Sequence, residues 1–147
     1  MPDASRSRTI AASAGDLWDV ISDPHHLPRW WPRVSRVEDV EQDAFTEVLK
    51  TAKGKVVRAD FQLVETDEQA RRVTWSQRVQ GTPFARLLRS AETEVRLEVD
   101  TAQATKVTIE LRQVLNGGFP RFGGYMVIRA ARATIDEALD GLERVGG

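Results

Sequence analysis

Apolar and polar residues alternate through most of the chain between Arg33 and Leu115. In residues 91–99 and 107–111, apolar or small side chains hold the odd-numbered positions, and charged or hydroxyl side chains mostly hold the even-numbered ones. This period of two is typical of strands with one buried and one solvated face. Short polar turns separate the runs, so the pattern predicts an antiparallel meander. The predicted strands lie within residues 6–12, 37–40, 45–49, 57–63, 73–79, 87–99 and 107–111.

The same alternation assigns a face to each strand residue. The residues predicted to face the core are Val95, Leu97, Ile109 and Leu111. The residues predicted to be exposed are Glu94, Arg96, Glu110 and Arg112. Carboxylates occupy the outer positions of the strands in this interpretation, so no pair of inner carboxylates is expected.

The apolar spacing changes to three and four near the end of the chain, which is the period of one helical face. The residues on this face are Ile128, Ala131, Ile135, Ala138 and Leu142. The helix is expected to begin between Pro120 and Tyr125, because Gly123 and Gly124 weaken its first turn, and to stop at Gly146. Since the preceding region is mostly strand, the sheet must curl around this helix to cover its apolar face.

Two short helices are predicted between the first and second strands. Ser13 is a suitable N-cap for the first helix. Asp23 followed by Pro24 is a second helix start, with Asp as the cap and Pro at the first helical position. Pro32 ends this region.

Composition narrows the function further. The chain has 147 residues, which fits one domain, 1–147. The net charge is −1 with no basic stripe, so nucleic acid is not an expected partner. The absence of cysteine excludes disulfides and thiol catalysis. The adjacent His25 and His26 are interpreted as solvated rather than catalytic, and neither a metal nor a cofactor is expected. Without a signal region or an apolar run of membrane length, we expect a cytoplasmic monomer or homodimer.

Five segments carry a resemblance to a known family: residues 14–24 (AGDLWDVISDP), 27–34 (LPRWWPRV), 72–75 (RVTW), 81–84 (GTPF) and 138–143 (ALDGLE). With the predicted order of elements, they resemble the START-like (helix-grip, SRPBCC) superfamily, and within it the polyketide cyclase/dehydrase and lipid-transport group. The resemblance covers nearly the whole chain. It implies an α+β helix-grip fold, in which a curved antiparallel sheet of about seven strands wraps around a long C-terminal helix. It also implies a deep, largely apolar cavity between sheet and helix.

Polar residues at predicted inner positions are the first candidates for ligand binding. Gln77, Arg89, Thr93 and Gln113 would each need a partner in a filled core, whereas a ligand-binding cavity explains all four. The alternative for Arg89 and Gln113 is that they lie near strand ends and reach solvent.

Aromatic residues are the second group of candidates. One of Trp30 and Trp31 is expected to point inward, and Trp75 belongs either to the core or to the cavity wall. Tyr125 either donates a hydrogen bond into the cavity or anchors the start of the helix. The full set of predicted ligand-binding residues is Trp30, Phe61, Trp75, Gln77, Arg89, Thr93, Gln113, Tyr125, Ile128 and Ala131.

Three functions remain open from the sequence. The first is a carrier or sensor that binds a small hydrophobic or aromatic molecule, such as a lipid or a polyketide. The second is a polyketide cyclase, aromatase or dehydratase in which Arg89, Thr93, Gln77 and Tyr125 orient a poly-ketone chain. The third is a protein-interaction module that uses Trp31. The alternation predicts no inner acid or base, which argues against the enzyme.

Overall fold

The computed structural model describes residues 3–117 and 121–146 of the chain. Its elements in chain order are β1 (Asp3–Ile10), α1 (Ala14–Ile21), the 3-10 helix η1 (Pro24–His26), α2 (Leu27–Trp30), β2 (Val34–Glu38), β3 (Ala44–Lys50), β4 (Val56–Asp67), β5 (Arg72–Gln77), the 3-10 helix η2 (Pro83–Arg86), β6 (Leu88–Thr101), β7 (Ala104–Leu115) and α3 (Arg121–Gly146).

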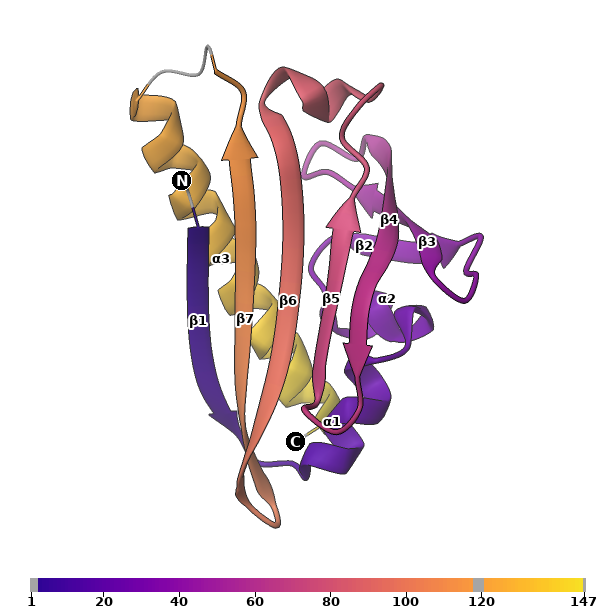
Figure 1. The fold of residues 1–147 in the computed structure, drawn as a ribbon, viewed down its shortest axis with the longest axis vertical. Coiled ribbons are helices and arrows are strands. Elements are labelled where there is room, and N and C mark those ends of the chain that lie inside the picture. Colours follow the sequence, from indigo (N-terminus) through magenta and orange to yellow (C-terminus); the bar gives the residue numbers. More distant parts are fainter. Residues whose placement is uncertain (1–2, 118–120, 147) are drawn as a thin grey trace.

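The strands form a single seven-stranded sheet in the order β1-β7-β6-β5-β4-β3-β2. Strands β2 to β7 follow one another as an antiparallel meander, and β1 pairs antiparallel with β7 (Figure 1). The helices after β1 lie between the first and second strands in sequence, as the pattern predicted. The predicted helix-grip architecture is therefore confirmed.

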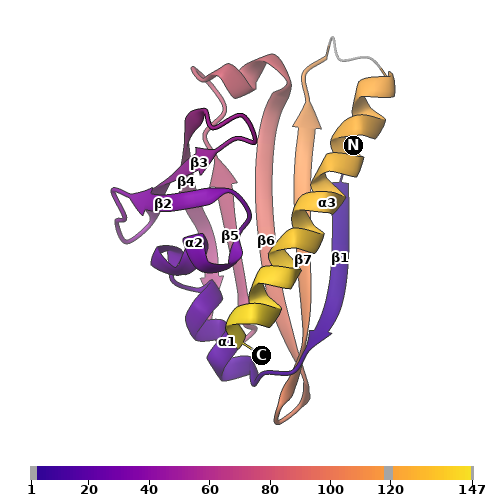
Figure 2. The same ribbon diagram turned by 180° about the vertical axis from the view of Figure 1, so that it is seen from behind.

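Helix α3 covers one face of the sheet. It runs diagonally across the long strands, with α1 and α2 beside its C-terminal half (Figure 2). Ile135, Ala138 and Leu142 are fully buried in this C-terminal half, because their spacing points all three at the sheet. Ile128, nearer the N-terminal end, is only half-buried. The helix begins at Arg121, within the predicted window, while Pro120 lies outside the described residues.

Local capping starts the short helices as predicted. The Asp16 backbone N–H donates to Ser13 Oγ over 3.1 Å, and the His25 backbone N–H donates to Asp23 Oδ1 over 3.0 Å. Each bond satisfies a donor that a helix start leaves free. In the described part of the chain, no helix is long and apolar enough to cross a membrane.

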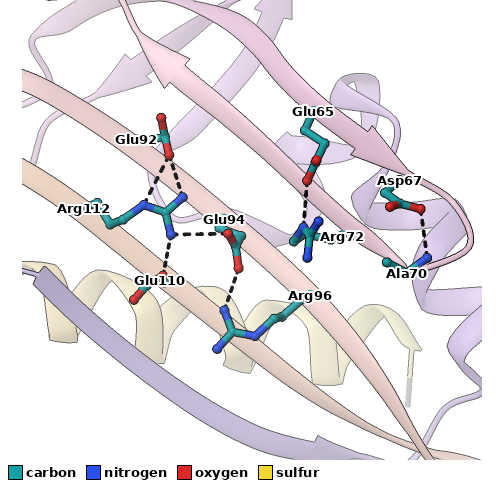
Figure 3. Close-up of polar contacts among 9 residues, drawn as sticks. All are labelled: Glu65, Asp67, Ala70, Arg72, Glu92, Glu94, Arg96, Glu110 and Arg112. Atoms are coloured by element: carbon teal, nitrogen blue, oxygen red, sulfur yellow. Dashed lines mark hydrogen bonds and ion pairs between the residues drawn. The ribbon is translucent and has the colours of Figure 1, made fainter.

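The outer face of the sheet carries an ion network around Arg112 on β7 (Figure 3). The Arg112 guanidinium donates to Glu92 over 2.5 Å, to Glu110 over 2.5 Å and to Glu94 over 3.3 Å. Arg96 donates to Glu94 over 2.6 Å. Partial burial would raise the pKa of Glu94, but bonds and charge from Arg96 and Arg112 outweigh it and hold that pKa below its ordinary value.

This network refines the predicted exposure of the outer residues. Glu94, Arg96, Glu110 and Arg112 lie on the face opposite the core, so the predicted register is correct. They are partly covered rather than freely exposed, and the Glu94 side chain keeps only 14% of its surface accessible. Neighbouring arginine side chains cover the carboxylates that they bind.

A bulge at the start of β6 overturns one prediction. Leu88 pairs with Leu115 while Ser90 pairs with Val114, so Arg89 is the extra residue between two registered pairs. An extra residue changes which face the preceding side chains occupy. Leu88 is consequently buried and Arg89 is exposed, so the prediction that Arg89 faces the cavity is wrong.

Candidate ligand-binding cavity

A cavity of about 330 Å³ lies between the inner face of the sheet and the N-terminal half of α3. Its lining residues on α3 are Val127, Ala130, Ala131 and Thr134. Phe84 and Leu87, in and just after η2, complete another part of the wall. Protein interiors are otherwise close-packed with few voids larger than a water molecule, so a space of this size needs a specific cause.

Small side chains on both layers are that cause. Ala130 and Ala131 on α3 lie opposite sheet positions that include Ala59 and Ala91, and all four line the cavity. In the C-terminal half of the helix, the larger side chains of Ile135, Leu139 and Leu142 fill the corresponding space, and all three are buried. Helix α3 therefore packs against a filled core along its C-terminal half and borders an open cavity along its N-terminal half.

A row of cross-strand neighbours runs across the cavity wall. Phe61 pairs with Gln77, Gln77 with Ala91, and Ala91 with Gln113. All four line the cavity. Ala91 separates the two glutamines, which lie two strands apart, or about 10 Å at the usual strand spacing. The buried Oε1 atom of Gln113 has no hydrogen-bond partner in the described structure, so it can accept a bond from a guest molecule.

Thr93 and Glu47 add further polar groups to this wall. Thr93 lies between Trp75 and Leu111 in the neighbouring row and is buried. Glu47 on β3 pairs with Ala59, lines the cavity and is only 3% exposed. Burial is the sole cause of a shift that raises the pKa of Glu47 to about 8. Glu47 therefore presents mainly a neutral carboxyl group to the cavity at pH 7.

Sequence reasoning missed Glu47, because it assigned carboxylates to outer positions. The signal was present: Phe45, Glu47 and Leu49 share one face under strict alternation. Phe45 is buried and Leu49 half-buried on that face. The expectation of no inner acid is therefore corrected, and the cavity wall carries a titratable group.

The tryptophans divide between core and cavity. Trp31 lines the cavity, whereas Trp30 is 1% exposed and lies in the core beneath it. Their rings meet edge to face with centroids 5.4 Å apart, and Trp31 makes a similar contact with Trp75 at 6.3 Å. Trp75 instead borders a smaller cavity of about 60 Å³ with Phe45 and Leu63.

The structure thus separates the predicted site residues into two groups. Those on the cavity wall are Phe61, Gln77, Thr93, Gln113 and Ala131. Those away from it are Trp30, Trp75, Arg89, Tyr125 and Ile128. Contact between a ligand and the first group stays a prediction.

The residues away from the wall are displaced for identifiable reasons. The cavity-facing stripe of α3 includes Val127, Ala131 and Thr134, and Ile128 lies just beside it. Tyr125 is 61% exposed and does not border the cavity. Trp31, which follows the last residue of α2, borders the cavity, whereas Trp30 at the end of that helix lies in the core.

The histidines lie outside the cavity. Asp23 Oδ1 lies 2.9 Å from Nδ1 of His25, which is exposed. Across residues 3–117 and 121–146, no three His, Cys, Asp or Glu side chains are grouped in a way that could hold a metal ion.

Over residues 1–147 the chain matches the family described as polyketide cyclase / dehydrase and lipid transport, and it belongs to that family. Membership supports a ligand-binding or cyclase role. A search of curated proteins finds no match.

Solved structures share the fold at low identity. XoxI from Bacillus cereus is 16% identical with a TM-score of 0.80, covering 99% of this chain and 96% of its own. A START superfamily protein from Mycobacterium smegmatis is 16% identical with a TM-score of 0.79, covering 98% and 96%. The di-domain ARO/CYC BexL from the BE-7585A biosynthetic pathway is 23% identical with a TM-score of 0.83, covering 98% of this chain and 46% of BexL. At these identities the likeness shows the fold alone.

Proposed function

We propose that the protein binds a small hydrophobic or aromatic molecule in the cavity between the sheet and α3, as a carrier or sensor. The observation that carries this proposal is the mainly apolar wall with a few inward polar groups, Gln77, Thr93 and Gln113 among them. Such a wall is the usual composition of a small-molecule site, where apolar surface gives affinity and a few polar groups give orientation.

The cavity volume limits the guest. Small-molecule pockets typically measure about 300–1,000 Å³, and about 330 Å³ lies at the low end. A molecule with two fused aromatic rings or a short acyl chain fits this volume better than a long-chain lipid does. Phe84 and Leu87 border the cavity, and Leu87 is 50% exposed, so this side is the expected entrance.

Tryptophan emission tests the proposal directly. The neutral probe 1-naphthylmethanol should change the emission of the protein and raise its melting temperature, because Trp31 borders the cavity and bound ligand stabilises the folded state. Trp31→Phe should remove most of the emission change but keep the thermal shift. Trp18→Phe is the matched control, because Trp18 is packed in the hydrophobic core and does not border the cavity. A panel of apolar probes that changes neither signal would refute the proposal.

A second candidate function is a cyclase or dehydratase acting on a poly-ketone chain in the same cavity. The observation that favours it is Glu47, whose pKa of about 8 suits a general acid or base near neutral pH. In a dehydration, the neutral carboxyl group at this position would protonate the departing hydroxyl group, and the resulting carboxylate would take up the proton lost from the adjacent carbon, so that water leaves and the acid is restored. Family membership is compatible with this chemistry.

Turnover separates the two functions. If the protein is an enzyme, Glu47→Gln should abolish conversion of a synthetic poly-ketone while the substrate still binds. If the protein is a carrier or sensor, the bound poly-ketone should be recovered chemically unchanged from the wild-type protein. Mass spectrometry of the recovered ligand reads either result.

A further inference from the structure

The titratable groups that line the cavity between the sheet and α3 are all acidic. Among the described residues that line it, none is Lys, Arg or His, and the titratable members are Glu47 and Glu92. The Glu92 carboxylate is occupied by Arg112 on the outer face of the sheet, at 2.5 Å. Glu47 is therefore the cavity carboxyl that retains no counter-charge.

Among the described residues, the strand neighbours of Glu47 provide no cation. Its registered neighbours are Val37 on β2 and Ala59 on β4, which are both apolar. On β4, Arg58 and Asp60 flank Ala59 in sequence, so their side chains lie on the opposite face of the sheet. Arg58 forms an ion pair with Glu38, and Asp60 accepts a hydrogen bond from Thr46. The titratable groups near Glu47 are thus directed away from the cavity by the strand period.

One other acceptor on the wall also lacks a partner. Gln113 Oε1, buried on β7, has no partner in the described structure. A buried acceptor without a donor costs free energy that a suitable guest can recover. The described wall therefore presents one unpartnered acceptor and the Glu47 acid beside neutral polar side chains, and it includes no fixed positive charge for an anionic guest.

We propose that the cavity selects apolar molecules carrying a basic amine, with the Glu47 carboxylate as the counter-ion of the bound ammonium group. This rests on the proposed binding function and specifies its ligand class. Fatty acids and other apolar anions are excluded, because a buried carboxylate facing Glu47 would have no positive partner. Neutral apolar molecules enter but gain less.

Ammonium binding requires that Glu47 lose its proton. Below about pH 8 the empty site holds the carboxyl group mainly in its protonated form. The incoming ammonium group keeps its own proton, the carboxyl proton passes to solvent, and a carboxylate–ammonium pair remains. Binding therefore releases about one proton per site at pH 6–7, a linkage that neutral ligands do not show.

Three probes of one shape test the proposal: 1-naphthylmethylamine, 1-naphthylmethanol and 1-naphthoic acid. Titration calorimetry at pH 7, in buffers of different ionisation enthalpy, gives both the affinity and the protons released. A charged hydrogen bond corresponds to about a tenfold or larger preference, so the amine should bind at least tenfold more tightly than the alcohol. The acid should bind most weakly of the three, and proton release should accompany the amine alone.

Two variants locate the effect at the cavity. Glu47→Gln should weaken amine binding about tenfold or more and abolish proton release, while weakening alcohol binding far less than amine binding. Glu98→Gln makes the same side-chain replacement on the exposed part of β6, away from the cavity, and should behave as the wild type.

The outcomes are distinguishable from failure of the proposed function. If the alcohol binds but the amine has no advantage, or if Glu47→Gln leaves amine affinity and proton release intact, the inference about the ligand class is overturned while the binding function stands. If none of the three probes binds to the wild-type protein, both the proposed binding function and the inference about the ligand class are refuted.

Discussion

Gly141 of α3 lies directly against the backbone of Trp30: a Cβ atom at position 141 would be 2.2 Å from the Trp30 carbonyl oxygen. This close approach holds α3 against the end of α2. It keeps Trp30 in the core and sets the position from which Trp31 reaches the cavity. A single glycine thus links the seating of the helix to the geometry of the site.

Gly141→Ala should therefore destabilise the protein. The obstructing atom belongs to the backbone and cannot rotate away, so the helix or α2 must shift, at a typical overpacking cost of about 1–3 kcal/mol. Urea unfolding measures the change. Gly15→Ala in α1 is the matched control, because the nearest atom to its added Cβ is Arg71 Nη1 at 4.0 Å. That control should gain about 0.4–1 kcal/mol. Equal effects of the two substitutions would contradict the close approach.

Glu47 should make stability fall as pH rises. Burial raises its pKa from 4.5 to about 8 in the folded protein, so between these values the folded state retains a proton that the unfolded chain has lost. Folding then takes up a proton, and the free energy of unfolding decreases with pH, by about 4 kcal/mol across the full window.

Glu47→Gln removes this dependence. The variant should be more stable than the wild type at pH 8–9, and the difference should shrink toward zero near pH 4.5. Chemical unfolding at a series of pH values measures it. A constant difference between variant and wild type across that range would show that Glu47 titrates normally and is not buried.

Arg112→Gln should leave three carboxylates on the outer face without their shared cation. Loss of its charged hydrogen bonds should destabilise the protein by about 1.5–3 kcal/mol. The depressed pKa of Glu94 contributes stability that is present above its ordinary pKa and is lost as pH falls. In Arg112→Gln the pKa of Glu94 should lie closer to its ordinary value, so this contribution and its loss in acid should both be smaller.

Arg72→Gln is the control for the network. It removes a more exposed ion pair with Glu65, and exposed pairs contribute about 0–1 kcal/mol. Acid titration followed by circular dichroism compares the variants. If Arg72→Gln lowered the free energy of unfolding as much as Arg112→Gln, the network would contribute no more than an exposed ion pair does.

Ala131→Leu should be neutral or stabilising in the absence of ligand. Ala131 borders the cavity, so the larger side chain can enter empty space and gain about 0.8 kcal/mol per buried CH₂. Ala138→Leu makes the same change seven residues along α3, at a fully buried position in the core cluster. There it should overpack and cost about 1–3 kcal/mol. Thermal unfolding compares the two. A similar loss at both positions would mean that protein atoms fill the space beside Ala131.

Much of the fold could be predicted from periodicity. The alternation in β6 and β7 placed Val95 and Ile109 on the buried face, and both are fully buried. Ser13 and Asp23 started their helices through side-chain caps, a local effect that sequence contains in full. These features depend on neighbours in the chain and on one repeating period.

The positions of the site residues depended on features that the alternation of apolar and polar residues does not encode. The bulge that exposes Arg89 is one extra residue in the pairing of β6 with β7, and it follows from how the strands meet. The choice of Trp31 over Trp30 as the cavity residue depends on where α2 ends, which is at Trp30. Glu47 shares a face with Phe45, so alternation alone could have found it, but the expectation that carboxylates face solvent concealed it.

Nuclear magnetic resonance with ¹⁵N-labelled protein and 1-naphthylmethanol tests most directly whether the cavity holds a guest. Saturating probe should shift the side-chain amide signals of Gln77 and Gln113 and the indole N–H signal of Trp31, which all border the cavity. The indole N–H of Trp18 and the backbone amide of the exposed Glu98 should stay in place. Binding at the cavity would be contradicted if saturating probe shifted the Trp18 and Glu98 signals while leaving Gln77, Gln113 and Trp31 unchanged, or if it shifted none of these signals.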